Sequence, residues 1–338
     1  MLKDSFGREI NYLRISLTDR CNLRCVYCLP KEGVKLLSSS EIMSYEEIFR
    51  FVNILSGLGV NKVRLTGGEP LLRSGVIDFI KDIKTIAGIK DLGLTTNGII
   101  FQKKIRDLYE AGLRRVNISV NTLKKEKYLR ITGSRNNNFD KIFKGINEAL
   151  DMKMNPVKLN VVALKGINDD EILDFAKLSK DKDLHIRFIE FMPIKEREIG
   201  WHDSYISVKT IKLIIEDKYG KLIPVKNAHG GSPAEYFKLK DSKGSLGFIS
   251  PVSLCFCEQC NRLRLTSDGK LRLCLFSDTE LDLKNMIRNG ASDKEIVALI
   301  KEAVLKKPKE HNLKNLKLTA GNLQLISECR RTMAEIGG

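Results

Sequence analysis

The sequence predicts an α/β protein: a partial (β/α)6 barrel of TIM type, followed by a smaller C-terminal α+β domain. Up to about residue 195, short apolar runs alternate with helical patterns, which indicates a parallel sheet. Most of these runs are polar on one face, whereas parallel strands covered by helices on both faces read as apolar throughout. Beyond residue 195 the alternation stops and short strands follow. We therefore expect two domains, at 1–195 and 196–338.

The predicted elements follow one another in a regular order. Strands are expected at 13–18, 62–66, 92–96, 116–120, 157–163 and 185–191, separated by helices at 44–58, 75–86, 102–111, 140–152 and 170–180. The C-terminal part is expected to contain helices at 208–219 and 293–305 and strands at 222–225, 235–239, 246–249, 263–266 and 271–273. Glycines such as Gly112 follow several of the predicted helices, as is common at helix ends.

The polar positions of the strands predict what the barrel encloses. Successive side chains of a strand point to opposite faces, and Arg14, Arg64 and Lys158 share the polar face. A closed eight-stranded barrel fills its interior with bulky apolar side chains, so a polar interior with six strands predicts an open barrel around a polar ligand. Buried cations are costly unless they meet an anion, so this ligand should carry several negative charges. Lys62 and Arg115 can alternatively lie at strand ends, in solvent.

The overall charge is less informative. The chain has 58 Lys and Arg against 42 Asp and Glu, a net charge of +16 that would suit nucleic acid, a membrane surface or a polyphosphate. Many lysines are scattered along predicted helices, which is typical of a solvated surface, and no aromatic-plus-basic RNA motif is present. No apolar run approaches the length of a membrane helix, and the N-terminus lacks a signal-peptide core. We therefore expect a soluble, cytoplasmic protein with neither a membrane nor a nucleic-acid partner.

Three cysteines after the first predicted strand form the run CNLRCVYC, with the spacing C-x3-C-x2-C. Thiolates at Cys21, Cys25 and Cys28 can hold three irons of a cubane cluster and leave the fourth iron open. Zinc is the alternative, but it prefers four ligands and no histidine lies nearby in the sequence. Disulfides are less expected still in a chain without a signal peptide.

The second predicted strand ends in the turn GGEP, residues 67–70. A cysteine triplet of this spacing followed by such a turn resembles the radical SAM superfamily. The resemblance implies that the open iron binds S-adenosylmethionine. It also implies that one electron from the cluster cleaves this cofactor to a 5′-deoxyadenosyl radical.

A second group of cysteines, Cys257, Cys260 and Cys274, has the spacing C-x2-C-x13-C. An Asp-Gly hairpin turn between the last two brings Cys274 back toward the others. A second cluster with an open iron fits, but CxxC followed by a hairpin is also a common zinc-ribbon pattern, so the residues alone leave both readings open. A C-x-C step is awkward for one cubane, so Cys255 is interpreted as spare. Arg262 and Arg264 share one strand face and suit phosphate recognition.

The whole chain resembles the GTP 3′,8-cyclase family of the radical SAM superfamily. The motifs are SLTDRCNLRCVYC, RLTGGEPLLR, GLTTNG, AGLRRVNIS, VKLNVVALKGIND, IRFIEFMP, CEQCNRLRLTSDGKLRLCLF and the final Gly337-Gly338. The resemblance implies a lyase that converts GTP to (8S)-3′,8-cyclo-7,8-dihydroguanosine 5′-triphosphate, the first step of molybdenum cofactor biosynthesis. It implies two 4Fe–4S clusters and S-adenosylmethionine as cofactors. The radical would remove hydrogen from C3′ of the ribose, and C3′ would then attack C8 of guanine.

The resemblance also implies roles for individual residues. Cys21, Cys25 and Cys28 would hold the first cluster, with Tyr27, Gly68, Ser119 and Met192 at S-adenosylmethionine. Cys257, Cys260 and Cys274 would hold the second cluster, which binds the guanine ring. GTP would also contact Arg14, Arg64, Thr95, Lys158, Arg262, Leu263 and Arg264, and the tail Gly337-Gly338 would reach into the active site. A homodimer is implied, with cyclic pyranopterin monophosphate synthase as the next pathway enzyme, whereas the electron donor, Cys255 and Cys329 stay unassigned.

Two rival functions are compatible with parts of the sequence. A peptide-modifying radical SAM enzyme would share the first half, but such enzymes usually carry more C-terminal cysteines. A zinc-containing nucleic-acid-binding protein would account for the charge and the CxxC hairpin. It predicts salt-dependent binding to RNA or DNA and a colourless protein without iron.

Overall fold

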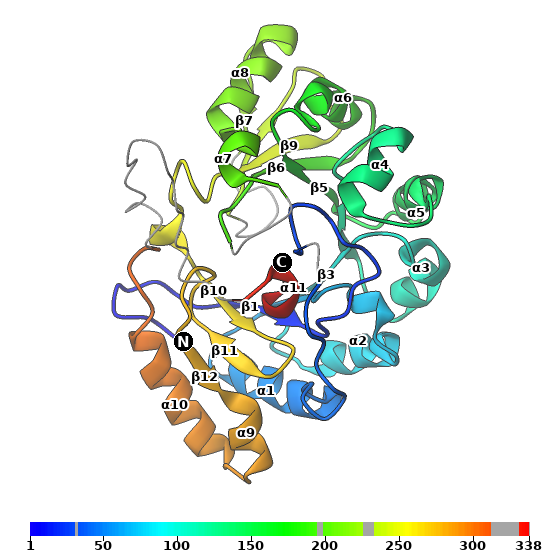
Figure 1. Ribbon diagram of the computed structural model, residues 1–338. Helices are drawn as coiled ribbons and strands as arrows, with labels where there is room; N and C mark the ends of the chain where they lie inside the picture. Colours follow the sequence, from blue (N-terminus) through cyan, green and yellow to red (C-terminus); the bar gives the residue numbers. More distant parts are fainter. Residues whose placement is uncertain (31–32, 195–198, 226–232, 312–330, 338) are drawn as a thin grey trace.

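The computed structural model describes residues 1–30, 33–194, 199–225, 233–311 and 331–337, and its centre is a curved 12-stranded sheet (Figure 1). The strand order is β12-β11-β10-β1-β2-β3-β4-β5-β6-β9-β8-β7. Its middle is the predicted partial barrel, six parallel strands in chain order: β1 (Tyr12–Ser16), β2 (Lys62–Thr66), β3 (Asp91–Thr96), β4 (Arg115–Ser119), β5 (Val157–Ala163) and β6 (His185–Glu190).

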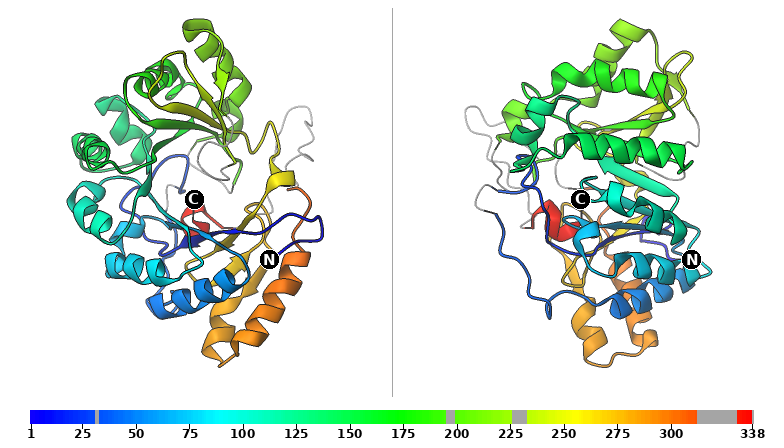
Figure 2. Two further views of the ribbon diagram at one scale, coloured as in Figure 1. Left: turned by 180° about the vertical axis from the view of Figure 1, so that it is seen from behind. Right: turned by 90° about the vertical axis from the view of Figure 1, so that its right-hand side faces the viewer.

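Helices between these strands cover the outer face of the sheet (Figures 1 and 2). They are α1 (Tyr45–Gly57), α2 (Val76–Thr85), α3 (Phe101–Glu110), α4 (Lys125–Thr132), α5 (Phe139–Asp151) and α6 (Ile172–Asp181). Five of the six were predicted to within about two residues at most ends, whereas α4 was not. Short 3₁₀ turns lie at Pro70–Leu72, Asp169–Glu171 and Cys257–Gln259.

Local sequence signals explain where the first helix begins. Ser44 caps α1: its Oγ accepts from the backbone nitrogen of Glu47 at 3.2 Å, and the Glu47 carboxylate accepts from the Ser44 nitrogen at 2.7 Å. This reciprocal pair satisfies two of the donors that a helix start otherwise leaves unpaired. Ser292 and Glu295 form the same pair at α10 (Asp293–Leu305).

The two faces of the sheet differ as the alternation of side chains predicts. Leu13, Ile15 and Leu17 are completely buried in the main apolar core. Arg14 lies between them in sequence and faces the inside of the curve, where it lines a cavity. The helices thus pack against one face, and the other face is left free for polar side chains.

The C-terminal half extends this sheet at both edges. It contributes α7 (Trp201–Ser204), α8 (Val208–Tyr219), β7 (Ile223–Pro224), β8 (Glu235–Lys238), β9 (Ser245–Ile249), β10 (Arg262–Leu265), β11 (Lys270–Arg272), β12 (Glu280–Asp282), α9 (Leu283–Arg288), α10 and α11 (Met333–Ile336). Strand β9 pairs in parallel with β6, and β10 pairs in parallel with β1. Both edges of the six-stranded sheet are therefore covered by strands from the second half, which removes their exposed backbone donors and acceptors.

The last described segment returns to the inside of the sheet. Helix α11 lies on the concave side, near β1 (red in Figure 1), and the Ser16 hydroxyl donates to the Ala334 carbonyl at 3.3 Å. Arg331 anchors this segment through Asp268 at 2.9 Å and Glu280 at 2.7 Å. Among the described residues, no helix is both long and apolar enough to cross a membrane.

Candidate active site

The inner face of the sheet encloses a cavity of about 300 Å³. All six cysteines of the two predicted groups line it, although the groups are more than 200 positions apart in the sequence. The cavity walls between them carry side chains from β1, β2, β5, β6 and β10. The fold therefore brings both cysteine groups and the predicted cationic residues to one space.

The GGEP turn positions the loop that carries the first cysteines. A Cβ at Gly67 would lie 2.6 Å from the Thr18 carbonyl oxygen, and one at Gly68 would lie 2.3 Å from that of Arg20. The φ angle of Gly67, +151°, is also one that residues with a side chain rarely adopt. The backbone nitrogen of Gly68 donates to the Thr18 carbonyl at 2.7 Å. Two glycines are thus needed for the turn to approach the chain just before Cys21.

Glu69 of the same turn is completely buried and joins this turn to the end of β3. Its carboxylate accepts from the Leu71 nitrogen at 3.1 Å, the Thr96 hydroxyl at 2.8 Å and the Asn97 nitrogen at 2.7 Å. Burial raises its pKa to about 7 against these hydrogen bonds. The Asn97 side-chain amide in turn lies 3.9 Å from the Cys21 sulfur. Glu69 therefore helps to position the cysteine loop through its hydrogen bond to Asn97.

The first cysteine group has the donor set of an iron–sulfur site. Burial raises the pKa of the Cys21 thiol to about 12 and that of Cys25 higher still, and the neighbouring sulfurs add to both shifts. Thiols this hard to ionise make poor nucleophiles, whereas a bound metal ion deprotonates its thiol ligands outright. Tyr27, Gly68, Ser119 and Met192 line the same cavity. The Tyr27 hydroxyl accepts from Asn121 at 2.7 Å.

The second cysteine group lies on the 3₁₀ turn before β10 and at the end of β11. The hairpin closes as predicted: the Thr266 nitrogen donates to the Lys270 carbonyl at 2.9 Å, and the Gly269 nitrogen donates to the Thr266 carbonyl at 3.0 Å. Burial alone would raise the pKa of Cys260, but Lys307 and Arg262 outweigh it and lower the pKa to about 7. Burial and the adjacent Cys255 raise the pKa of Cys257 to about 12. Cys260 is therefore more readily ionised than Cys257 at neutral pH.

Three arginines lie side by side across the cavity floor. In the register of the sheet, Arg14 is the direct neighbour of Arg264 on β10 and of Arg64 on β2. The Arg64 guanidinium extends over Gly93 of β3, where a Cβ would lie only 1.8 Å from Nη1. The buried Nε and Nη1 atoms of Arg64 make no hydrogen bond within the part of the chain described. Unsatisfied donors of this kind point to an anionic ligand.

Lys158 is a buried lysine beside this row. Burial and the charges of Arg187, Arg115 and Arg64 lower its pKa to about 5. Burial also lowers the pKa values of Arg14 and Arg264, with further contributions from neighbouring arginines. An anion in the cavity would offset the repulsion among these groups and raise their pKa values.

The remaining predicted residues differ in position. Thr95, Arg262 and Lys62 line the cavity, whereas Arg115 is paired with Asp91 at 2.6 Å. Leu263 is buried in the main core, on the opposite face of β10, so only its backbone can approach a ligand.

The C-terminal tail reaches the cavity. Arg264 donates to the Gly337 carbonyl at 2.6 Å. Gly338 and Cys329 lie outside the described residues.

Several residues of the site were missed at the level of sequence. Arg187 lines the cavity, and the alternation of β6 would have found it. Tyr12, also on the wall, has its pKa lowered to about 7, because Arg64 and Arg14 outweigh the opposing effect of burial. Lys307 bonds to the Arg262 carbonyl at 3.1 Å, far from β10 in sequence, and no local signal pointed to it.

Two family models match consecutive parts of this chain. The model of the radical SAM superfamily matches residues 15–179. The model described as Molybdenum Cofactor Synthesis C matches residues 184–313. The first match covers the first cysteine group and the second match covers the other.

Curated relatives match nearly the whole chain. A GTP 3′,8-cyclase from Thermodesulfovibrio yellowstonii is 53% identical over 309 residues, which cover 91% of this chain and 94% of the relative. The GTP 3′,8-cyclase of Pelotomaculum thermopropionicum is 45% identical over 337 residues, which cover 100% of this chain and 100% of the relative.

Solved structures of low sequence similarity share the fold. Streptococcus suis SuiB bound to S-adenosylmethionine matches with a TM-score of 0.62 at 13% identity. The match covers 91% of this chain and 74% of SuiB. Together with the family models, it confirms the predicted partial barrel with a further C-terminal region.

Proposed function

This chain belongs to the GTP 3′,8-cyclase family of radical SAM enzymes, and from this premise we propose how its cavity binds cofactor and substrate. The enzyme converts GTP to (8S)-3′,8-cyclo-7,8-dihydroguanosine 5′-triphosphate, the first step of molybdenum cofactor biosynthesis. A radical SAM enzyme uses a 4Fe–4S cluster and S-adenosylmethionine. Cys21, Cys25 and Cys28 are the proposed ligands of that cluster.

We assign the opposite end of the cavity to GTP and a second 4Fe–4S cluster. Cys257, Cys260 and Cys274 are its proposed ligands, with the open iron directed at the guanine ring. The arginine row supports this assignment most strongly: Arg14, Arg64 and Arg264 are adjacent in the sheet and line the same cavity as both cysteine groups, and Arg64 is buried. Guanidinium forks suit a triphosphate, which would supply the missing partners of Arg64.

The residues of this chain position the substrate and keep water away from it. When bound, the first cluster and S-adenosylmethionine supply the radical that removes hydrogen from C3′ of the ribose. Tyr27, Gly68, Ser119 and Met192 would hold S-adenosylmethionine at that end. Arg262, Thr95, Lys158 and the backbone at Leu263 complete the proposed GTP contacts, and the C-terminal tail would reach into the active site beside Arg264, which bonds to the Gly337 carbonyl. With substrate bound, the surrounding sheet would help to keep water away from the radical.

The wider setting of the enzyme is part of the same proposal. We assign it a cytoplasmic location and a homodimeric assembly. Its product would pass to cyclic pyranopterin monophosphate synthase. The family resemblance, rather than any contact in the structure, supports these three assignments.

A single assay tests the reaction. Reduced, reconstituted enzyme is mixed anaerobically with GTP and S-adenosylmethionine, and the products are identified by mass spectrometry. We expect 5′-deoxyadenosine together with cyclised GTP. Release of 5′-deoxyadenosine with GTP unchanged would contradict the assignment, and a colourless protein without iron would support the zinc-protein alternative.

Arginine variants test the substrate site separately. Arg262→Ala or Arg264→Ala should lose cyclised product and keep binding of S-adenosylmethionine to the first cluster, measured by electron paramagnetic resonance. Arg288→Ala is the matched control, because Arg288 lies outside the cavity and pairs with Glu47 at 2.6 Å. Product yield at the wild-type level in either cavity variant would remove that arginine from the site.

A further inference from the structure

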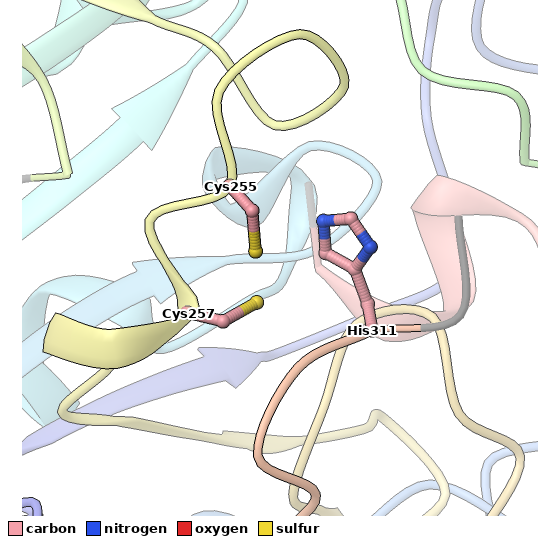
Figure 3. Close-up of side chains that lie close together, drawn as sticks. All are labelled: Cys255, Cys257 and His311. Carbon is pink, nitrogen blue, oxygen red and sulfur yellow. The ribbon is translucent and has the colours of Figure 1, made fainter. Parts of the chain in front are cut away.

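Cys255, Cys257 and His311 form a second constellation beside the proposed GTP cluster. One ligand atom from each residue lies within 4.8 Å of those of the other two. Figure 3 shows both sulfur atoms and the imidazole ring turned toward one another. The cysteines belong to the loop after β9, and His311 belongs to the segment after α10. Cys255 and His311 have no part in the function proposed above.

The spacing of these atoms suits a single metal ion better than a cluster. Zn–S bonds of about 2.3 Å and Zn–N bonds of about 2.0 Å in a tetrahedron place ligand atoms about 3.5 to 3.8 Å apart. A closure of roughly 1 Å from the observed arrangement would reach this. The cysteines of a cubane bind separate irons and lie farther apart. Two thiolates and an imidazole are also a donor set typical of zinc.

Existing contacts already hold His311 in this position. The ring is buried, and its Nε2 lies 2.8 Å from the Pro251 carbonyl oxygen, on the same loop as the two cysteines. Phe276 packs against the ring edge-on, with 4.9 Å between the centroids. The imidazole ring is therefore already held in place before a metal ion binds.

Arg8 joins the two segments that carry the ligands. Its guanidinium donates to the Cys257 carbonyl at 2.7 Å and to the carbonyls of Lys309 at 2.8 Å and Pro308 at 2.7 Å. Asp4 pairs with Arg8 at 2.5 Å and keeps the buried guanidinium in place. A buried arginine therefore fixes the backbone on both sides of the constellation.

We propose that Cys255, Cys257 and His311 bind one Zn²⁺ ion when the second cluster is absent. Three protein ligands leave the fourth position to water, on the side of the cavity that Cys257 and His311 line. Because Cys257 would serve both metals, zinc and the second cluster exclude each other. The competition depends on the second cluster assigned under the proposed function. The zinc site itself does not depend on that cluster.

Cobalt binding tests the site. The full-length chain with Cys21, Cys25 and Cys28 replaced by Ser is freed of metal and titrated with Co²⁺, which reports thiolate ligands and tetrahedral geometry by its absorption. We expect one Co²⁺ per chain, displaced by Zn²⁺. Cys255→Ser and His311→Phe should weaken Co²⁺ binding by more than the ten- to hundredfold typical of an outer-shell residue. Cys260→Ser and Cys274→Ser should leave it unchanged.

Folding controls keep this result interpretable. His311→Phe preserves ring packing against Phe276, and His311→Cys should restore Co²⁺ binding with a changed spectrum, because it supplies another ligand. Each variant is compared by circular dichroism. Binding that is lost in Cys260→Ser and Cys274→Ser but kept in Cys255→Ser would overturn the proposal, since the ion would then sit on the cluster cysteines.

Iron analysis tests the competition. The wild-type chain is reconstituted anaerobically with iron and sulfide, with and without one equivalent of Zn²⁺. We expect about eight irons without zinc and about four with it, and about eight in both conditions for Cys255→Ser. About eight irons in the wild type despite zinc would overturn the competition. About four irons without zinc would instead contradict the second cluster, and the cobalt titration would still decide the zinc site.

Discussion

The arginine row shows how much of the site depends on single residues. The polar face of each strand could be assigned from the alternation of its residues. That the three arginines are neighbours is known only from the register of the sheet, which pairs Arg14 with Arg64 and Arg264. Gly93 also matters to this row, because a larger residue there would displace the Arg64 guanidinium from its position. Each of these cations is costly to bury alone, so the free cavity favours any ligand with several negative charges.

Lys158 makes a testable difference to the pH dependence of GTP binding. With a pKa of about 5, its amine is mostly neutral at pH 7 in the free enzyme. A bound triphosphate would raise this pKa, so binding takes up a proton, and affinity should fall by up to about tenfold per pH unit above pH 5. Isothermal titration calorimetry in buffers of different ionisation enthalpy measures the uptake. We expect Lys158→Met to reduce it by about one proton at pH 7.

Tyr12 is the matched control for this measurement. Its pKa of about 7 makes it half ionised at neutral pH, so Tyr12→Phe should reduce the uptake by no more than about half a proton. Protons taken up by GTP itself cancel between variants. Equal uptake in the wild type and Lys158→Met would show that Lys158 does not change its protonation state when GTP binds, which would contradict the prediction.

Buried glutamates connect the elements around the site. Glu69 holds the GGEP turn, and Glu171 accepts from the Thr122 hydroxyl at 2.8 Å and the Leu123 nitrogen at 2.6 Å. Glu190, at the end of β6, accepts from the nitrogens of Val208 at 2.9 Å, Val252 at 3.0 Å and Ser253 at 2.9 Å. It thereby fixes the loop that leads to the second cysteine group.

Glu190→Gln should loosen that loop. An amide nitrogen cannot accept, so at least one backbone N–H that now meets a carboxylate oxygen would lose its partner, at a cost of about 1–3 kcal/mol. Denaturant unfolding and hydrogen exchange of residues 250–260 measure the two effects, and both should change. Glu302→Gln, an exposed residue paired with Lys306, should stay within about 0.5 kcal/mol of the wild type. Unchanged exchange in Glu190→Gln would show that the loop is held by other contacts.

Most elements of both halves could be predicted because their signals are local. The strands at 62–66 and 157–163 and the helices at 208–219 and 293–305 have the predicted bounds. Helix α4 was missed because it is short and polar, and α11 because four residues carry little periodicity. The pairing of β9 with β6 and of β10 with β1 joins distant segments, and nothing in either strand specifies its partner.

The same limit applied to the candidate site. Cysteine spacing and strand alternation were enough to predict residues that the fold brings to one cavity, including Lys158 and Arg264. Glu190, Lys307 and His311 act through contacts with segments far away in the sequence, so their local surroundings gave no indication. Buried polar partners of this kind become visible only when the sheet is assembled.

At the scale of the whole molecule, the two halves of the chain share one sheet. Strands β1 and β6 would be the edges of the barrel if residues 1–195 stood alone, each with an unpaired row of backbone donors and acceptors. Strands β10 and β9 cover these edges in the full chain. The family models also meet between residues 179 and 184. The boundary between the two family models is therefore not a boundary in the sheet, which continues through both halves.

This topology predicts that the halves do not fold independently. Residues 1–195 expressed alone should aggregate or elute as large oligomers, because two open, parallel edges invite pairing with other copies. Coexpression with residues 196–338 should restore a complex that copurifies and unfolds in one transition. Size-exclusion chromatography and thermal unfolding provide the measurements, with the intact chain as the control. A monomeric, cooperatively unfolding 1–195 fragment would show instead that the six-stranded barrel is stable with both edges exposed, and the C-terminal half would then be a true appended domain.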